Sequence, residues 1–180
     1  SKWQNMAEYV AKIIKVFSQD LGLFTYNKMI VADSKDILEY PMLTFYGGFD
    51  LSSRKLLVQE ISSNWFYIQT FNNKSCKSSL DLGFIKFLTS WKLGKIDSEL
   101  ILKEKSINKF IYKNTKSIHP KDINIFYPYI NNVTRNNNPK ISFNTDDFPT
   151  NNNCFKRLGQ IYLKTATMLY NLQYTLGDEL

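Results

Sequence analysis

The two ends of the chain carry its most constraining pattern, because apolar residues recur there every three or four positions. The first pattern stops before Gly22 and joins Trp3, Met6, Val10, Ile13, Ile14, Phe17 and Leu21. The second pattern joins Phe155, Leu158, Ile161, Tyr162, Leu169 and Leu172. This spacing places the apolar side chains on one face of a helix. Each end of the chain is therefore predicted to form an amphipathic helix.

Short apolar runs between these two helices favour β-strands. Residues 28–32 form an apolar run bounded by polar residues, which is typical of a buried strand. Pro41 ends or kinks the helix or turn that begins at Ser34. The runs at 55–61 and 65–71 are rich in residues that favour strands, and Ser62-Ser63-Asn64 separates them. Two such runs joined by a short polar segment predict a β-hairpin.

The remaining segments give a mixed pattern. Residues 72–79 read as a polar loop, and residues 81–93 are consistent with either a strand or a helix. Residues 98–118 continue with helical spacing, whereas the aromatic segment 123–130 is predicted to be extended. Residues 131–153 are rich in asparagine and are predicted to form a mobile polar loop.

The composition suits one folded domain. The chain has 180 residues, of which 43% are hydrophobic and 15% aromatic, enough to build a sizeable core. Strands that lie between flanking helices indicate an α/β class. We therefore expect a single α/β domain over residues 1–180, with a central sheet flanked by amphipathic helices at both chain ends.

The charge balance points to a polyanionic partner. Twenty-three Lys and Arg residues against sixteen Asp and Glu residues give a formal net charge of +7. A net positive charge raises the affinity of a protein for nucleic acid, acidic lipid head groups or acidic proteins. The alternative is that the many lysines and asparagines reflect a compositional bias of the source genome.

Several classes of chemistry lack the residues they need. His119 is the only histidine, and Cys76 and Cys154 lie far apart, so no zinc or redox spacing and no hydrolase signature is present. The chain also lacks a glycine-rich phosphate loop, a signal peptide and an apolar run long enough to cross a membrane. We expect an intracellular protein without a cofactor, a membrane association or a small-molecule substrate.

Carboxylates supply the one candidate set for catalysis. Hard oxygen ligands of this kind hold Mg²⁺ when they converge. The candidates are Asp33, Asp36, Asp50, Glu60, Asp81, Asp97 and Glu104. Their spacing does not force them together, so the competing interpretation is that they are surface charges and helix caps, with Asp33 or Ser34 as an N-cap.

A lysine-rich segment supplies the candidate for nucleic-acid binding. Six lysines and one acid, Glu104, fall between residues 103 and 121. If the segment is helical, steps of four and three place four lysines on one face. They are Lys105, Lys109, Lys113 and Lys116. Such a stripe follows a phosphate backbone and makes binding sensitive to salt; the alternative is the solvated face of an ordinary helix. The density of aromatic residues also favours binding over catalysis.

Two stretches resemble the core of the XPF-type structure-specific endonucleases. "MIVADSKDILEYPML" (29–43) is similar to the first strand and helix of that family, and "LILKEKSINKFI" (100–111) to its Glu-Arg-Lys strand and the following helix. In active members these strands supply carboxylates and a lysine that bind Mg²⁺ and activate water. Here Lys35-Asp36 stands in place of Arg-Glu, and Lys103-Glu104-Lys105 shifts the charge order.

The resemblance therefore implies the catalytically inactive branch of the family. Its members pair with a second fold-mate and recognise branched DNA, including in meiotic crossover complexes during recombination. The expectation is a non-enzymatic, intracellular and nuclear domain that forms a heterodimer with a protein partner and binds DNA through Lys105, Lys109, Lys113 and Lys116. One alternative is a Mg²⁺-dependent nuclease that uses Asp33 and Asp36 with Glu60 or Glu104. A second is a purely protein-binding module.

Overall fold

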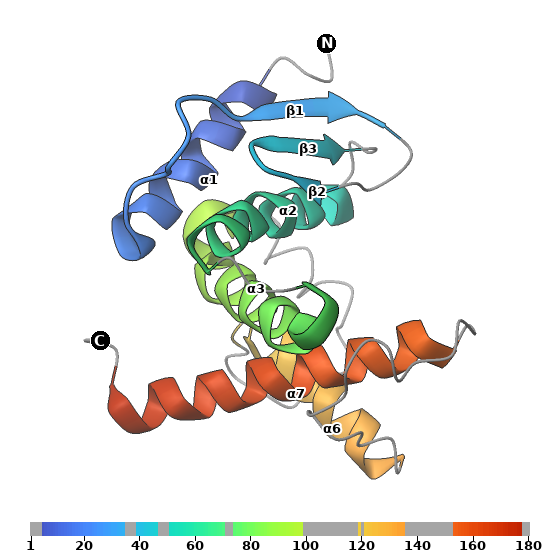
Figure 1. The fold of residues 1–180 in the computed structure, drawn as a ribbon. Helices are drawn as coiled ribbons and strands as arrows, with labels where there is room; N and C mark the ends of the chain where they lie inside the picture. The colour runs from blue at the N-terminus through green and yellow to red at the C-terminus, as the bar shows by residue number, and fades with distance from the viewer. Residues whose placement is uncertain are drawn as a thin grey trace. The chain divides into compact units, whose positions relative to one another are not determined.

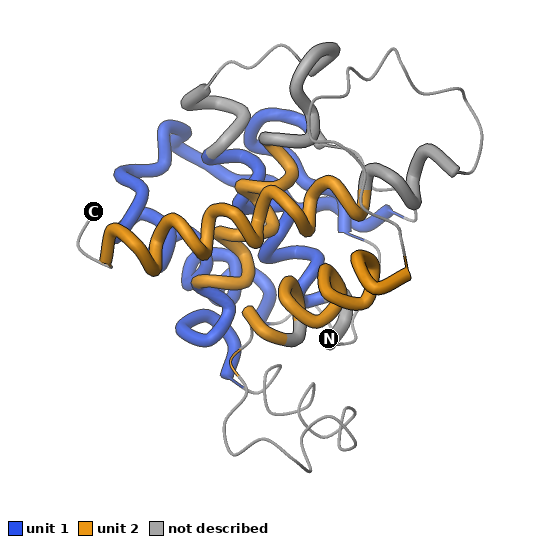
Figure 2. The backbone as a smooth tube through the Cα atoms, turned by 90° about the horizontal axis from the view of Figure 1, so that it is seen from below, with its two compact units in different colours: residues 1–70, 92–117 blue, residues 71–91, 118–180 orange. Residues whose placement is uncertain are grey.

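A computed structural model of the chain describes residues 5–34, 39–46, 51–70, 74–98, 119, 121–135 and 153–177. The chain divides into two compact units, which Figure 2 distinguishes by colour. Unit 1 comprises Ser1–Thr70 and Lys92–Ser117, and unit 2 comprises Phe71–Trp91 and Ile118–Leu180. The division falls inside helix α3 (Lys74–Ile96), between Trp91 and Lys92.

Unit 1 begins with the helix that the sequence predicts. Helix α1 (Met6–Leu21) buries Val10, Ile13 and Phe17, which all belong to its apolar stripe. The helix ends at Gly22, whose φ of 91° favours a residue without a side chain. The Gly22 carbonyl accepts a 3.1 Å hydrogen bond from Nε1 of Trp65, a buried residue of a later helix.

A small sheet follows α1 and is not the central sheet that the sequence predicts. Its three strands are β1 (Ile30–Asp33), β2 (Glu39–Tyr40) and β3 (Leu43–Tyr46), in the order β1-β3-β2 (Figure 1). β1 pairs with β3 in parallel, and β2 pairs with β3 antiparallel. Most of the described residues are helical instead, so the predicted mixture of helices and strands is confirmed only in its helical ends and in this short sheet.

The predicted hairpin over 55–71 is wrong, because helix α2 (Leu51–Thr70) occupies this region. Leu57, Val58, Ile61 and Trp65 are all buried, at intervals of one, three and four residues that suit one side of a helix. The polar residues between the two apolar runs do not form a turn. Ser62 and Ser63 donate hydrogen bonds to the carbonyls of Gln59 and Glu60, three residues earlier. Backbone bonds of this type let short polar side chains lie buried in a helix.

Unit 2 consists of helices in the part of the chain that the structure describes. They are the first part of α3, the short π-helical turn η1 (Asp122–Phe126), α6 (Tyr127–Thr134) and α7 (Asn153–Leu176). Helix α7 confirms the predicted C-terminal helix. Helix α3 resolves the ambiguous segment 81–93 as helical and corrects the predicted loop from Lys74 onward.

The segment 123–130 was predicted to be extended, and this prediction is wrong. Its residues lie in η1 and α6. Pro128 is the second residue of α6, which continues directly from η1. The predicted asparagine-rich loop also begins later than expected, since α6 continues through Thr134, and Asn153 already belongs to α7. Residues 136–152 lie outside the described part of the chain.

Aromatic side chains form the core of unit 2. Ile125, Ala166 and Tyr170 are buried together, and Phe87, Trp91 and Phe126 pack against them. Helices α3 and α7 approach closely at Gly83, where an added Cβ atom would collide with the side chain of Thr165. Among the helices that the structure describes, none has the length and apolarity needed to cross a membrane.

Candidate functional site

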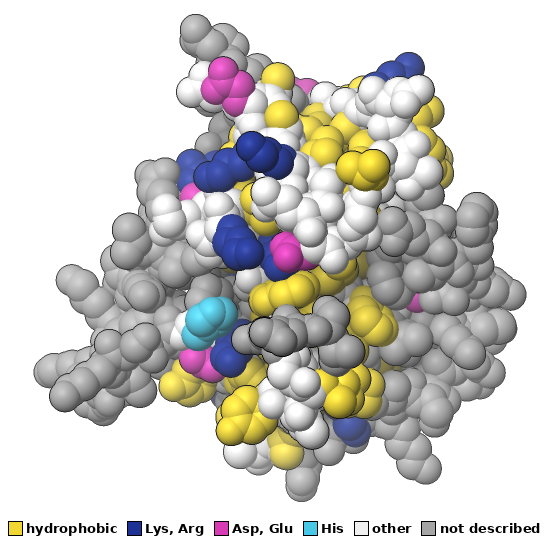
Figure 3. Space-filling model, turned by 90° about the vertical axis from the view of Figure 1, so that its left-hand side faces the viewer, with side chains coloured by type: hydrophobic (Ala, Val, Ile, Leu, Met, Phe, Trp, Pro, Cys, Tyr) yellow, Lys and Arg dark blue, Asp and Glu magenta, His cyan; other side chains and the backbone are white. Residues whose placement is uncertain are grey.

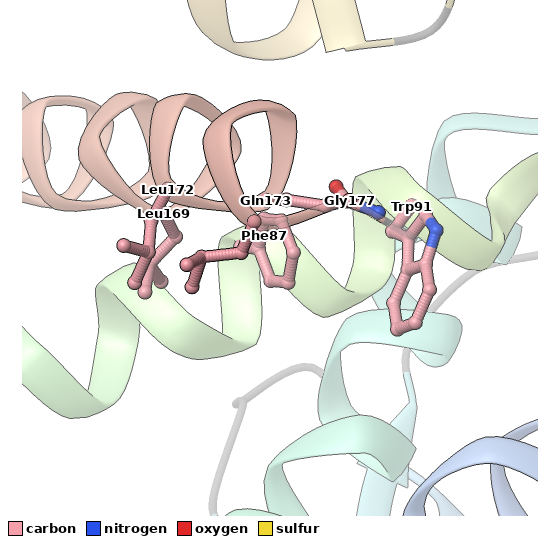
Figure 4. Close-up of a pocket in the computed structure, with 7 residues that line it drawn as sticks. Phe87, Trp91, Leu169, Leu172, Gln173 and Gly177 are labelled. Atoms are coloured by element: carbon pink, nitrogen blue, oxygen red, sulfur yellow. The ribbon is translucent and has the colours of Figure 1, made fainter. Parts of the chain in front are cut away.

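An apolar cavity of about 210 Å³ lies between α3 and the C-terminal half of α7 in unit 2 (Figure 4). We call it the C-terminal groove. Its lining comprises Phe87, Trp91, Leu169, Leu172, Gln173, Leu176 and Gly177. The residues come from two helices that face each other, and all but Gln173 present apolar or aromatic surface to the cavity.

Aromatic side chains fix one wall of the C-terminal groove. Phe87 and Trp91 lie one turn apart on α3 and stack with their ring centroids 5.8 Å apart. Phe87 also meets Tyr170 of α7 edge to face, with centroids 4.6 Å apart. Such aromatic pairs add stability beyond the area that they bury. The wall is therefore packed against the core of unit 2.

The opposite side of the groove continues into an exposed apolar stripe. Met168, Leu172 and Leu176 follow one another at intervals of four residues on α7 and are 48%, 50% and 57% exposed. The same helix buries Ile161, Ala166 and Tyr170 on its inner face. A surface helix usually has a polar outer face, so a second apolar stripe beside a groove is typical of an interaction site.

The described part of unit 2 has an excess of basic residues. The described residues of unit 2 include eight Lys and Arg residues and two acids, Asp81 and Asp122, which gives a formal charge of +6. Asp81 is 1% exposed. Helix α7 contains Lys156, Arg157 and Lys164 but no acidic residue. Figure 3 shows one face of the molecule, on which hydrophobic side chains lie exposed among Lys, Arg, Asp and Glu side chains.

Tyr170 connects the groove wall to the preceding η1 region. Burial raises the pKa of Tyr170 to about 12, with an opposing effect from the nearby Ser90 side chain and a further rise from the Asp122 carboxylate. The Lys121 ammonium lies 5.7 Å from the centroid of the Tyr170 ring, within the range of a cation–π interaction. Tyr170 therefore stays protonated over the physiological pH range.

The only histidine of the sequence has a local structural role. His119 is exposed, and its backbone N–H donates to Oδ2 of Asp122 at 3.0 Å. The backbone N–H of Lys121 donates to Nδ1 of His119 at 3.3 Å. These bonds shape the turn that leads into η1, where unpaired backbone groups at a helix start need partners.

The four lysines predicted to bind nucleic acid cannot be placed by this structure. Lys105, Lys109, Lys113 and Lys116 all lie outside the described residues. The prediction that they share one helical face stays a prediction.

The described carboxylates occupy separate places. Asp33 is exposed at the end of β1, Glu60 is buried in α2, and Asp97 is buried next to Arg54. Asp81 belongs to unit 2. Asp36, Asp50 and Glu104 fall outside the described residues. In the described ranges, no three Asp, Glu, His or Cys residues lie close enough to hold a metal ion together.

The apolar pattern of the C-terminal helix is the sequence signal for the groove, but by itself it predicts only a single apolar helix face. The spacing predicts Leu169 and Leu172 on one apolar stripe, and in the structure both line the groove, but Leu169 is 8% exposed and Leu172 is 50% exposed. A helix that lines a groove in this way carries apolar residues over more of its circumference than the single stripe that faces the core. The resulting groove can bind apolar side chains of another molecule. Comparisons of the chain with protein-family models, with curated proteins and with solved structures found no match.

Proposed function

We propose that the protein is a non-enzymatic interaction domain that binds a protein partner through the C-terminal groove. The observation that carries this proposal is the exposed stripe of Met168, Leu172 and Leu176 beside an aromatic wall. Fully burying an aliphatic side chain contributes about 1.5–3 kcal/mol. Because each of these three side chains is about half exposed, roughly half of that free energy per side chain can still be gained when a partner covers it.

The geometry favours a helical segment of the partner. A groove between two helices accepts an amphipathic helix that inserts apolar side chains at intervals of three and four residues. The excess of basic residues in the described part of unit 2 favours a partner helix that carries acidic residues. The resemblance to inactive XPF-type nucleases supports a fold-mate as the partner, and hence a heterodimer.

Charge substitution in the groove tests the proposal. The full chain and its Leu172→Glu and Leu176→Glu variants are used to capture partners from source cells, and the captured proteins are quantified by mass spectrometry. Tyr174→Glu is the matched control, because Tyr174 lies on the same helix, is 90% exposed and does not line the groove. We expect the first two variants to lose at least tenfold of a specific partner that the control retains. Equal retention by all three variants excludes the groove as the binding site.

DNA binding is a second proposed activity, which the net charge of +7 and the lysine-rich segment favour. The test replaces Lys105, Lys109, Lys113 and Lys116 with Glu and titrates salt against branched and linear DNA, with and without Mg²⁺. Weaker binding with a smaller salt slope supports phosphate contact by these lysines. Unchanged binding rejects it. Cleavage in Mg²⁺ favours the nuclease alternative instead. A function on DNA would place the protein in the nucleus.

A further inference from the structure

The small sheet of unit 1 has an outer face that is apolar at every strand position. Thr44 and Tyr46 of β3 are buried and define the inner face, so Leu43 and Phe45, which alternate with them, point outward. Residues that pair in register share a face of the sheet. The outer face therefore comprises Ile30, Ala32, Tyr40, Leu43 and Phe45. A sheet that covers the core with one face usually has a polar outer face, which this sheet lacks.

The acidic residues of the three strands take positions of the inner face. Asp33 pairs with Tyr46, and Glu39 pairs with Thr44. The strands therefore place no carboxylate on the outer face, where it would repel a phosphate chain. Lys28, which is exposed, lies two residues before β1, and the whole chain has a formal net charge of +7. An apolar face without acids in a basic protein suits a polyanion that carries flat apolar groups.

Two aromatic side chains stand on neighbouring strands of this face. Tyr40 of β2 meets Phe45 of β3 edge to face, with ring centroids 6.3 Å apart. Each ring restricts the rotation of the other, so the pair presents its surface without a large loss of freedom on binding. The Tyr40 side chain is 53% exposed. Aromatic rings that lie exposed on a sheet stack on the bases of unpaired nucleotides.

The size of the outer face argues against a globular partner or a second copy of the chain. Ile30 and Tyr40 are 42% and 53% exposed, and the other three residues are more buried. With about 250 Å² as the upper limit for one side chain, the five residues expose at most about 500 Å². A stable protein interface buries about 800 Å² on each partner. A few stacked bases need less area, because each base gains affinity from its contact with one ring.

We propose that the outer face of the sheet is a platform on which single-stranded nucleic acid stacks its bases, with Tyr40 and Phe45 as the stacking residues. The proposal rests on the nucleic-acid binding proposed above and assigns its substrate class, which is unpaired bases. Bases inside a duplex already stack on one another and offer no free face to the platform. Stacking holds the bases and lysines hold the phosphates, so substitutions of the two kinds have different effects on salt dependence.

Fluorescence anisotropy over a range of salt concentrations tests the platform. The probes are labelled twelve-nucleotide strands of thymidine and of uridine, a DNA duplex, and an abasic strand that has the same phosphates without bases. We expect either single strand to bind at least tenfold more tightly than the abasic strand and the duplex, and the tighter of the two identifies DNA or RNA as the ligand.

Variants of Tyr40 separate stacking from phosphate contact. Tyr40→Ala should weaken single-strand binding about fivefold or more at every salt concentration and leave the salt slope unchanged, because it removes a ring and no charge. Tyr40→Trp should retain binding, which shows that the loss in Tyr40→Ala does not come from misfolding. Tyr174→Ala is the matched control, because Tyr174 is 90% exposed in unit 2, and it should bind like the unaltered chain.

Ultraviolet cross-linking of a strand that carries 5-iodouracil should join the base to Tyr40 or Phe45, as mapped by mass spectrometry. If the unaltered chain binds none of the probes, this proposal and the DNA-binding proposal both fail. If it binds the single strands but Tyr40→Ala binds them equally well, or if the abasic strand binds equally well, the platform alone is rejected. A dimer in sedimentation that Tyr40→Ala dissociates also rejects it, because a second copy then covers the face.

Discussion

Arg54 and Asp97 form a two-point ion pair inside unit 1. Nε of Arg54 donates to Oδ2 of Asp97 at 2.8 Å, and Nη2 donates to Oδ1 at 2.6 Å. The Tyr9 hydroxyl donates to Oδ2 at 2.9 Å, and the Arg54 guanidinium lies 5.7 Å from the centre of the Tyr9 ring. The pair therefore joins α1, α2 and the residue after α3. Burial and the Asp97 carboxylate raise the pKa of Tyr9 above its usual range, and Arg54 opposes that rise.

We expect Arg54→Ala to destabilise unit 1. Asp97 is 5% exposed, so removal of the guanidinium leaves a buried carboxylate without its cation. Breaking a buried ion pair in this way lowers the free energy of unfolding by about 3 kcal/mol or more. We expect the lower value here, because the Arg54 side chain is partly exposed. Urea denaturation followed by circular dichroism measures the change. Lys95→Ala, at an exposed position of α3, is the control and is expected to change stability by less than about 0.5 kcal/mol. Equal stability of the two variants would contradict a structural role for the pair.

The raised pKa of the buried Tyr170 hydroxyl predicts that the folded protein loses stability at high pH. In the unfolded chain its hydroxyl ionises near pH 10, its ordinary value, whereas in the folded chain burial raises its pKa to about 12. The resulting stabilisation is complete below pH 10 and is lost as the pH rises through 12. A shift of this size corresponds to about 2.7 kcal/mol once the pH is well above 12, of which about 2 kcal/mol is lost by pH 12.

The measurement is the free energy of unfolding in urea at pH values from 9 to 12. We expect the unaltered chain to lose more stability over this range than Tyr170→Phe, by about 2 kcal/mol. Tyr174→Phe is the control, because Tyr174 is 90% exposed, and it should follow the unaltered chain. Parallel curves for all three proteins would exclude a buried, neutral Tyr170.

Two helical glycines in unit 2 are expected to respond oppositely to alanine. A Cβ at Gly83 collides with Thr165 Cβ, and neither atom can move without shifting a helix. Gly83→Ala should therefore lower the free energy of unfolding by about 1–3 kcal/mol. A Cβ at Gly159 of α7 meets no atom within 4 Å. Gly159→Ala should raise stability by about 0.5–1 kcal/mol, because alanine favours a helix. Thermal unfolding of both variants checks the signs, and a stabilising Gly83→Ala contradicts the close approach of α3 and α7.

Helix α1 could be predicted from the sequence because its outer face is polar. Helix α1 alternates cleanly between buried Ile13 and Phe17 and exposed Lys12 and Lys15. Periodicity identifies such a helix because its two faces meet different environments. Only one wall of the C-terminal groove could be predicted from the sequence. Its α7 residues are apolar positions of a predicted helix, whereas the α3 residues lie in a segment that is consistent with either a strand or a helix.

Helix α2 could not be predicted in this way, because its polar residues are buried. Ser62, Ser63 and Asn64 are at most 4% exposed and bond to backbone carbonyls one turn earlier. In a sequence they interrupt the apolar pattern and imitate a turn. Their partners exist only once the helix has formed, so tertiary burial overrides the local preference of these residues.

The turn between β2 and β3 yields the last prediction. Tyr40 pairs with Leu43, so Pro41 and Met42 form a two-residue turn, and Met42 has a φ of 54°. Proline followed by a residue with positive φ is typical of a type II turn, in which glycine is favoured at the second position. Oδ1 of Asn64 accepts a 2.7 Å hydrogen bond from the Met42 N–H and helps to hold this strained conformation. Met42→Gly should raise the free energy of unfolding by up to about 1 kcal/mol, because it removes the steric strain.

Asn64→Ala should lower the free energy of unfolding by about 1–3 kcal/mol, because it leaves the Met42 N–H without this acceptor. In the double variant Met42→Gly/Asn64→Ala the cost of losing Asn64 should shrink, since a glycine holds the turn without help. A double-mutant cycle in urea measures this coupling. Strictly additive effects of the two substitutions would show that Asn64 stabilises α2 alone and does not hold the turn.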